Sequence, residues 1–360
     1  MDKLPERIRI KDIARLAEVS VGTVDRVLHG RPGVSKNSRE RVEKILKELD
    51  YHPNMYASAL ASNKKYNFVC MLPLHSTRSY WHDIEQGARK AELSYSDFHI
   101  SVEMLHYDPY DFSSFESVGK KALDMNPDGV MFSPTMSRTT LVFTKELEER
   151  KIPYVFVDSQ VKEASPLAFF GQQAMQSGYF AGRMLMLLAH EKEAVVVFRH
   201  SRGGQMGSNQ QHEREIGFRY YMNEHHKTCK IWELDVDVRQ NQEETIQLLD
   251  DFFTSHPEVK LGITFNSQVH VFGEYLEYRN KSKAFNLLGY DLLDRNVNCL
   301  RKGTVTFLIA QQPFFQGYNG IQTLCKSLIL RKEVKQVNYM PIDLLSAENL
   351  DYYLDSQESE

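Results

Sequence analysis

Residues 10–62 read IKDIARLAEVSVGTVDRVLHGRPGVSKNSRERVEKILKELDYHPNMYASALAS, and this stretch decides how the chain is organised. Apolar side chains recur in it at three- and four-residue steps, a pattern that predicts three short helices around one small core. We expect the helices over residues 11–18, over about residues 21–28, and from residue 36 onward. Ser20 and Ser35 stand where the N-caps of the second and third helices are expected.

The second predicted helix has an apolar and a polar face. Its apolar residues would face the core: Val21, Val24, Val27 and Leu28. On the polar face, Arg26 can form two hydrogen bonds to a guanine edge in the major groove, and the hydroxyls of Ser20 and Thr23 can contact phosphates. The pattern therefore indicates a helix-turn-helix that reads DNA. The alternative is a small helical bundle that carries an arginine on its surface.

The charge distribution favours the DNA-binding interpretation. Residues 1–65 hold 14 Lys and Arg against 9 Asp and Glu, whereas residues 66–360 hold 30 against 39. A basic amino-terminal part attached to an acidic remainder suits a polyanionic partner. A chain of 360 residues is also long enough for a small head and two larger lobes, each with its own core.

Targeting and cysteine patterns point to a cytoplasmic protein. The start MDKLPERIRI has no apolar run, and no stretch is long and apolar enough to span a membrane. The cysteines form no CxxC pair, which argues against a zinc motif or a disulfide framework: Cys70, Cys229, Cys299 and Cys325. We therefore expect no metal site, no cofactor and no contact with a membrane.

Three segments, IKDIARLAEVSVGTVDRVLHG, VSKNSRERVEKILKELDYHPN and YASALAS, together resemble the lactose-repressor (LacI/GalR) family of bacterial transcription regulators. The resemblance implies a helix-turn-helix domain over residues 1–53 and a hinge helix with its linker over residues 54–65. It places Val21, Gly22 and Arg26 at base-reading positions of the recognition helix. In the hinge helix it implies roles for Asn54, Ala57 and Leu60.

The hinge roles have a physical rationale. Leu60 falls on the leucine that enters the minor groove, and unstacking a base step there costs a few kcal/mol. Ala57 and Ala61 are small enough to let the hinge helices of two subunits pack closely. The alternative is that Leu60 simply packs on the neighbouring domain. The resemblance further implies a homodimer on a near-palindromic operator.

From residue 66 onward, apolar strand-like segments alternate with helical ones, which predicts an α/β fold with parallel sheets. Polar residues follow several of the predicted strands: Ser133, Asp158, Asn266, Asp291 and Gln311. In open α/β sheets ligands bind beyond the carboxyl ends of the strands, so these residues are candidates for a ligand site. Taken singly, each is better explained as a helix cap or a turn residue, but their recurrence at strand ends favours a ligand site.

Residues 66–345 resemble the effector domains of the same family, which are similar in fold to type I periplasmic sugar-binding proteins. The resemblance implies two lobes over residues 66–355 that close on a ligand, followed by a disordered tail over residues 356–360. It implies that sugar hydroxyls are held by Asp158, Arg214, Asn266, Asp291 and Gln311. Tyr80 and Trp81 would cover the apolar face of the sugar, unless they only pack at the start of a helix.

The sequence thus predicts a transcription regulator whose operator affinity responds to a monosaccharide or sugar derivative. An alternative is a co-repressor-type regulator that responds to a purine or another metabolite. A more distant alternative is a sugar-processing enzyme with Asp158 and Asp291 as its carboxylate pair. Enzyme motifs are missing, because GxSxG, GxxxxGK[ST] and GxGxxG do not occur and HEKEA and HEREI lack the second histidine of HExxH.

Overall fold

The computed structural model divides the chain into two compact units, residues 1–63 and residues 64–360, and each is described here by itself. The described residues are 9–28, 31–49, 51, 55–60, 62, 64–190, 193–203, 205–206, 208–237, 239–281 and 284–358. None of the helices within these ranges is long and apolar enough to cross a membrane.

The smaller unit contains the three predicted helices, α1 (Ile10–Leu16), α2 (Val21–Leu28) and α3 (Lys36–Glu48). Their buried side chains form one core: Ile13, Ala14, Ala17, Val24, Val27 and Val42. Both predicted caps are confirmed, because the hydroxyl oxygens of Ser20 and Ser35 accept hydrogen bonds from the backbone N–H three residues later, at 3.1 and 3.2 Å. A further helix, α4 (Met55–Leu60), lies within the predicted hinge.

Two details of the head differ from the prediction. Val21 was expected in the core, but its side chain is 51% exposed at the first position of α2. Helix α1 was expected to reach Glu18, but it ends at Leu16 because Glu18 has a left-handed backbone with φ of 53°. The chain therefore turns earlier than the apolar pattern suggested.

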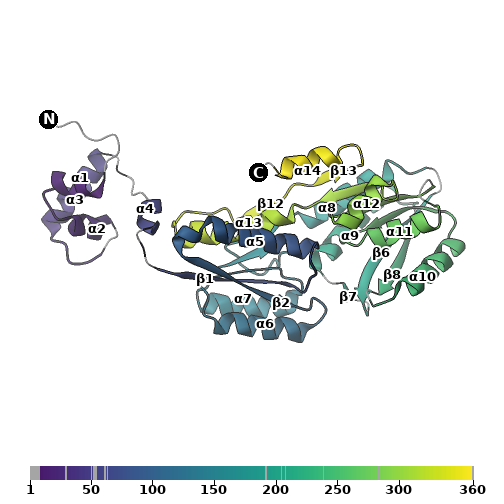
Figure 1. Cartoon of the computed structure of the whole chain (residues 1–360), viewed down its shortest axis with the longest axis horizontal. Coiled ribbons are helices and arrows are strands. Elements are labelled where there is room, and N and C mark those ends of the chain that lie inside the picture. The colour runs from purple at the N-terminus through teal and green to yellow at the C-terminus, as the bar shows by residue number, and fades with distance from the viewer. Residues whose placement is uncertain are drawn as a thin grey trace. The chain divides into compact units, whose positions relative to one another are not determined.

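The first lobe of the larger unit is a six-stranded sheet in the order β12-β5-β4-β3-β1-β2, in which all paired strands are parallel. Helices α5 (Tyr80–Ser94) and α13 (Pro313–Leu328) cover one face, and α6 (Phe112–Asp124) and α7 (Ser137–Glu149) cover the other (Figure 1). The remaining elements are β1 (Tyr66–Pro73), η1 (Ser96–Phe98), β2 (Ile100–Tyr107), β3 (Gly129–Phe132), β4 (Tyr154–Val157), β5 (Ala168–Gly171) and β12 (Val337–Tyr339).

The second lobe is a seven-stranded sheet in the order β13-β11-β10-β9-β6-β7, with β8 paired to β6. Its strands are β6 (Ala194–Arg202), β7 (Gln205–Met206), β8 (Ile231–Asp237), β9 (Val259–Thr264), β10 (Asn286–Tyr290), β11 (Phe307–Ala310) and β13 (Asp343–Leu345). Its helices are α8 (Ala174–Met186), α9 (Asn209–His225), α10 (Gln242–Ser255), α11 (His270–Tyr278) and α12 (Asp294–Arg301). Two separate apolar clusters fill the two sides of this sheet.

The chain passes between the lobes three times: from β5 to α8, from β11 to α13, and from β12 to β13. The last helix, α14 (Leu350–Glu358), packs Leu350, Tyr353 and Leu354 against the core of the second lobe. Because α14 includes residues 356–358, the prediction of a disordered tail from residue 356 is wrong for those three residues. Residues 359 and 360 lie outside the described residues.

Candidate functional site

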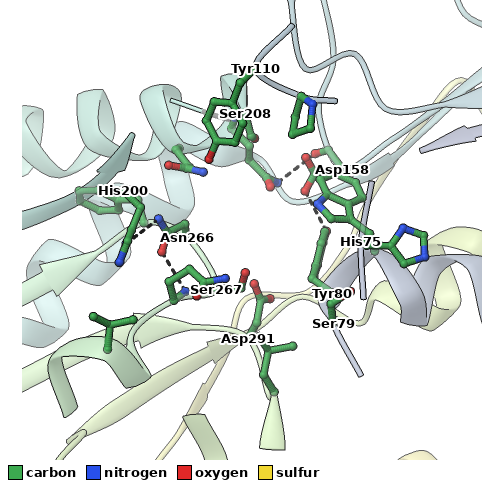
Figure 2. A pocket seen from close by; sticks show the side chains of 18 of the residues that line it. His75, Ser79, Tyr80, Tyr110, Asp158, His200, Ser208, Asn266, Ser267 and Asp291 are labelled. Carbon is green, nitrogen blue, oxygen red and sulfur yellow. Dashed lines mark hydrogen bonds between the residues drawn. The ribbon is translucent and has the colours of Figure 1, made fainter. Parts of the chain in front are cut away.

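The carboxyl ends of strands from both lobes meet at a cavity of about 480 Å³. It is lined by seven of the eight side chains predicted to hold a ligand: Tyr80, Trp81, Asp158, Arg214, Asn266, Asp291 and Gln311. Figure 2 shows His200 and Asn266 on one side of the cavity and Tyr80 and Asp158 on the other. The eighth, Ser133, is fully buried but is not part of this lining, and its backbone carbonyl accepts a 2.6 Å hydrogen bond from the Tyr107 hydroxyl.

Asp158 follows β4 and is held firmly in place. Its backbone is left-handed, with φ of 67°, a conformation that aspartate tolerates better than most residues. Its two carboxylate oxygens accept hydrogen bonds from the Tyr80 and Ser159 hydroxyls, both at 2.8 Å. The Tyr80 ring also packs edge-on against Trp81, with ring centroids 5.0 Å apart. Tyr80 therefore orients the carboxylate, whereas Trp81 is less buried and lines the cavity.

Asp291 follows β10, and its backbone is left-handed too, with φ of 72°. Its carboxylate accepts a 2.6 Å hydrogen bond from the Gln311 amide, and the Gln311 carbonyl oxygen in turn accepts one from the Arg214 guanidinium. Arg214 also donates to the Phe265 carbonyl at 3.0 Å and lies over the Tyr290 ring, 3.9 Å from its centroid. These contacts fix a buried chain of alternating donors and acceptors.

Burial dominates the electrostatics of the hydrogen-bonded side chains of Asp158, Asp291 and Arg214. Loss of hydration raises the pKa of Asp158, and it raises the pKa of Asp291 to about 7. The positive charge of Arg214 opposes both shifts without cancelling them. The cavity thus contains two buried carboxyl groups and one guanidinium. Ionisation of both carboxyl groups is unfavourable there because they have lost hydration, and hydroxyl groups of a ligand would stabilise the charged forms by donating hydrogen bonds.

The opposite wall offers donors. The Asn266 side-chain oxygen accepts hydrogen bonds from the Thr264 hydroxyl at 3.0 Å and the Gln268 backbone N–H at 2.9 Å. Its amide nitrogen donates to His200 Nδ1 at 3.2 Å, which leaves the His200 proton on Nε2. Burial lowers the pKa of His200 to about 4, so the imidazole is neutral. Among the described residues, neither His200 Nε2 nor Arg214 Nε has a hydrogen-bond partner.

Two functional candidates escaped the sequence analysis. His200 lies within β6 and carried no motif. Gln172 is buried on the first passage between the lobes, where its amide nitrogen donates to the carbonyls of Ala310, at 2.8 Å, and Pro341, at 2.7 Å. Those carbonyls belong to the other two passages, so one side chain joins all three. Gln172 directly follows the apolar run of β5 (Ala168–Gly171), so the strand-end rule could have found it.

The predicted DNA-reading residues lie on α2. Val21 and Gly22 are exposed and Arg26 is exposed too, whereas the Thr23 hydroxyl is 2.9 Å from the Ser20 hydroxyl. Within the part of the head that the structure describes, the Arg26 side chain forms no hydrogen bond or ion pair, so its guanidinium is available to a partner.

In the predicted hinge, α4 includes Ala57 and ends at Leu60, whose side chain is 49% exposed. The predicted hinge residue Asn54 lies outside the described residues.

Comparison with known proteins adds family membership to this geometry. The family model described as "Bacterial regulatory proteins, lacI family" matches residues 9–54, and that described as "Periplasmic binding protein domain" matches residues 68–332. The curated HTH-type transcriptional regulator DegA of Bacillus subtilis is 26% identical over 218 residues. That match spans 60% of this chain and 60% of DegA.

Solved structures match a larger share of the chain. A protein from Bacteroides fragilis described as a LacI transcriptional regulator is 57% identical, with a TM-score of 0.78, over 81% of this chain and all of that chain. A carbohydrate transporter solute-binding protein from Agrobacterium radiobacter, solved with D-arabinose, has a TM-score of 0.69 at 20% identity over 82% of this chain and 99% of that chain, and so shares the fold alone. The chain therefore belongs to the lacI family of bacterial regulatory proteins, and a periplasmic binding protein domain forms its larger part.

Proposed function

We propose that the protein is a transcription regulator that binds operator DNA through α2 and α4 and a monosaccharide, or a close derivative, in the 480 Å³ cavity. The observation that carries the proposal is the set of buried, prearranged polar groups around that cavity, in a chain whose residues 9–54 match the lacI family. We further propose that it acts as a cytoplasmic homodimer on a near-palindromic operator, with one head on each half-site.

The chemistry of the cavity favours a neutral polyol. Vicinal hydroxyls both donate and accept, so they can donate to Asp158 and Asp291 while accepting from donor side chains of the same cavity lining, among them Arg214 and Asn266. Two buried carboxylates against one guanidinium disfavour an anionic ligand such as a sugar phosphate. The structural neighbour solved with D-arabinose, although distant in sequence, has the same fold around a ligand of this class.

Contacts across the cavity suggest how ligand and DNA binding are coupled. Arg202 of the second lobe pairs with Asp108 of the first at 2.7 Å, and Asn209 donates to the Pro134 carbonyl at 2.9 Å. A sugar that touches both lobes would favour this closed arrangement, because it has more partners there than in an open one. We propose that closure changes the spacing of the two hinge helices and thereby the affinity for the operator.

A two-part binding assay tests the proposal. The full chain would be screened by thermal shift against pentoses, hexoses, inositols, sugar phosphates and purines, because a ligand that binds only the folded state stabilises it by about 2.7 kcal/mol at a hundredfold excess over Kd. Operator binding would then be measured with and without each ligand found. We expect a neutral monosaccharide to bind unchanged, without being converted, and to alter operator affinity. Binding of purines alone would instead support the co-repressor alternative, and ligand turnover would support the enzyme.

Arg26→Ala tests the recognition helix. If Arg26 reads a base, we expect the variant to lose about 1–3 kcal/mol of discrimination between operator and a variant operator, because a bidentate contact to a base carries that much specificity. Sugar binding should not change, since Arg26 is in the other structural unit. Lys44→Ala, an exposed change on α3, is the control. An unchanged footprint and unchanged discrimination for Arg26→Ala would remove the residue from the recognition surface.

A further inference from the structure

A second cluster of functional side chains lies beside the cavity, in the first lobe. His75 follows β1, Glu85 lies on α5, and His106 is the penultimate residue of β2. One nitrogen of each histidine and a carboxylate oxygen of Glu85 all lie within 4.8 Å of one another. Glu85 Oε2 is 3.3 Å from His75 Nε2 and 2.8 Å from His106 Nε2. All three side chains are at least two-thirds buried, with exposures of 7%, 18% and 32% for His75, Glu85 and His106.

The hydrogen bonding of His75 places a proton or a metal ion between its Nε2 and the Glu85 carboxylate. Its Nδ1 is 2.8 Å from the Pro73 carbonyl oxygen, which can only accept, so Nδ1 carries a hydrogen. In a neutral imidazole, Nε2 then presents a lone pair to the Glu85 carboxylate oxygen at 3.3 Å. Two lone pairs at that distance repel each other unless a proton or a metal ion lies between them. His106 has no such conflict, because its Nε2 can carry the hydrogen and donate to Glu85.

We propose that His75, Glu85 and His106 bind a divalent transition-metal ion, Zn²⁺ by preference. Ligand atoms around a tetrahedral zinc lie about 3.3 Å apart, given zinc–nitrogen and zinc–oxygen bonds of about 2.0–2.2 Å. The His75–Glu85 separation of 3.3 Å already matches this value, and the third ligand atom, His106 Nε2, lies 2.8 Å from the same carboxylate oxygen. The Pro73 carbonyl on His75 Nδ1 is the outer partner that metal-bound histidines usually have.

The ligand set also decides the class of metal. Two imidazoles and one carboxylate favour Zn²⁺ over Mg²⁺ and Ca²⁺, which prefer sites made of oxygen alone. Three protein ligands leave a fourth position for water or another oxygen. The sequence predicted no metal site because residues 75, 85 and 106 have no recognisable spacing and meet only through the pairing of β1 with β2 and the packing of α5 against both strands. The site is separate from the proposed sugar contacts, although His75 also lines the cavity.

Competition for Zn²⁺ between the full chain and a chromophoric chelator tests the site. After chelator treatment and dialysis, we expect the wild-type chain to take up one equivalent of tightly bound Zn²⁺ that millimolar Mg²⁺ does not displace. His75→Ala, Glu85→Gln and His106→Gln should each weaken that binding by more than about 100-fold, because even outer-shell partners of metal ligands are worth 10–100-fold. Zinc-edge X-ray absorption of the wild type should show two imidazole ligands.

His212→Ala removes a histidine of the second lobe that lies outside the cluster and is the matched control, expected to bind Zn²⁺ as the wild type does. Circular dichroism of Glu85→Gln and of His106→Gln, whose side chain is partly exposed, shows that lost binding does not reflect unfolding. The proposal is overturned if wild type takes up no tight equivalent. It is also overturned if the three variants bind as wild type does, or if Cys229→Ser abolishes binding instead.

Discussion

Asp291→Asn is expected to weaken the response to the sugar strongly and, at the same time, to make the ligand-free protein more stable at pH 8. The first effect follows because the carboxylate is the acceptor that Gln311 holds toward the cavity at 2.6 Å, and an amide accepts more weakly. Asparagine also tolerates the left-handed backbone of residue 291, so the fold should not suffer. We expect sugar affinity to fall by about 10- to 100-fold, the typical loss for a hydrogen bond to a charged group.

The second effect follows from the pKa of Asp291. Burial raises this pKa from 3.8 to about 7. Between about pH 4 and pH 7 the Asp291 carboxyl is therefore protonated in the folded protein but ionised in the unfolded chain. Stability therefore falls as the pH rises through this window, by up to roughly 4 kcal/mol for such a shift. The asparagine of the variant does not titrate. We expect the variant to exceed wild type by about 1 kcal/mol or more in unfolding free energy at pH 8, and to lose most of that advantage at about pH 4.

Denaturant unfolding at the two pH values, with sugar titrations in parallel, measures both effects. Asp124→Asn, an exposed change at the end of α6, should alter neither. Operator binding without sugar should be preserved, which separates a lost ligand site from a lost regulator. A variant that is less stable than wild type at pH 8 would show that the Asp291 charge is well compensated, contrary to this account.

The sequence predicted the fold well because its signals are local. Buried parallel strands are continuous apolar runs, as in YVFV, residues 154–157, which forms the fully buried strand β4. The short strands β7, β12 and β13 were not predicted, since two or three residues carry no periodicity. The predicted tail was wrong at residues 356–358 because its polarity outweighed the apolar anchors Leu350 and Leu354, which begin the same helix.

Part of the cavity could be predicted because ligand sites in parallel sheets lie beyond the carboxyl ends of the strands. Asp158, Asp291 and Gln311 follow strands, so topology brings them together whatever the details of packing. Ser133 obeys the same pattern and does not line the cavity, which shows that a strand end sets a residue's location but not where its side chain points. His200 lies inside β6, and the His75–Glu85–His106 cluster joins three elements. Such groupings depend on register and side-chain rotamers, which no local pattern specifies.

Gln172→Met is expected to destabilise the protein by about 2–5 kcal/mol. Methionine fills a similar space but leaves the buried carbonyl of Ala310 and the partly buried carbonyl of Pro341 without their amide donor, and a buried loss of this kind costs about 1–3 kcal/mol. Because these carbonyls lie on two different passages between the lobes, hydrogen exchange should also accelerate around residues 310–312 and 341–343. Gln247→Leu, an exposed change on α10, is the control for loss of a glutamine amide. A decrease of less than about 1 kcal/mol in the free energy of unfolding, with unchanged hydrogen exchange in both segments, would contradict this prediction. It would mean that the two sheets alone hold the three passages and that Gln172 does not couple them.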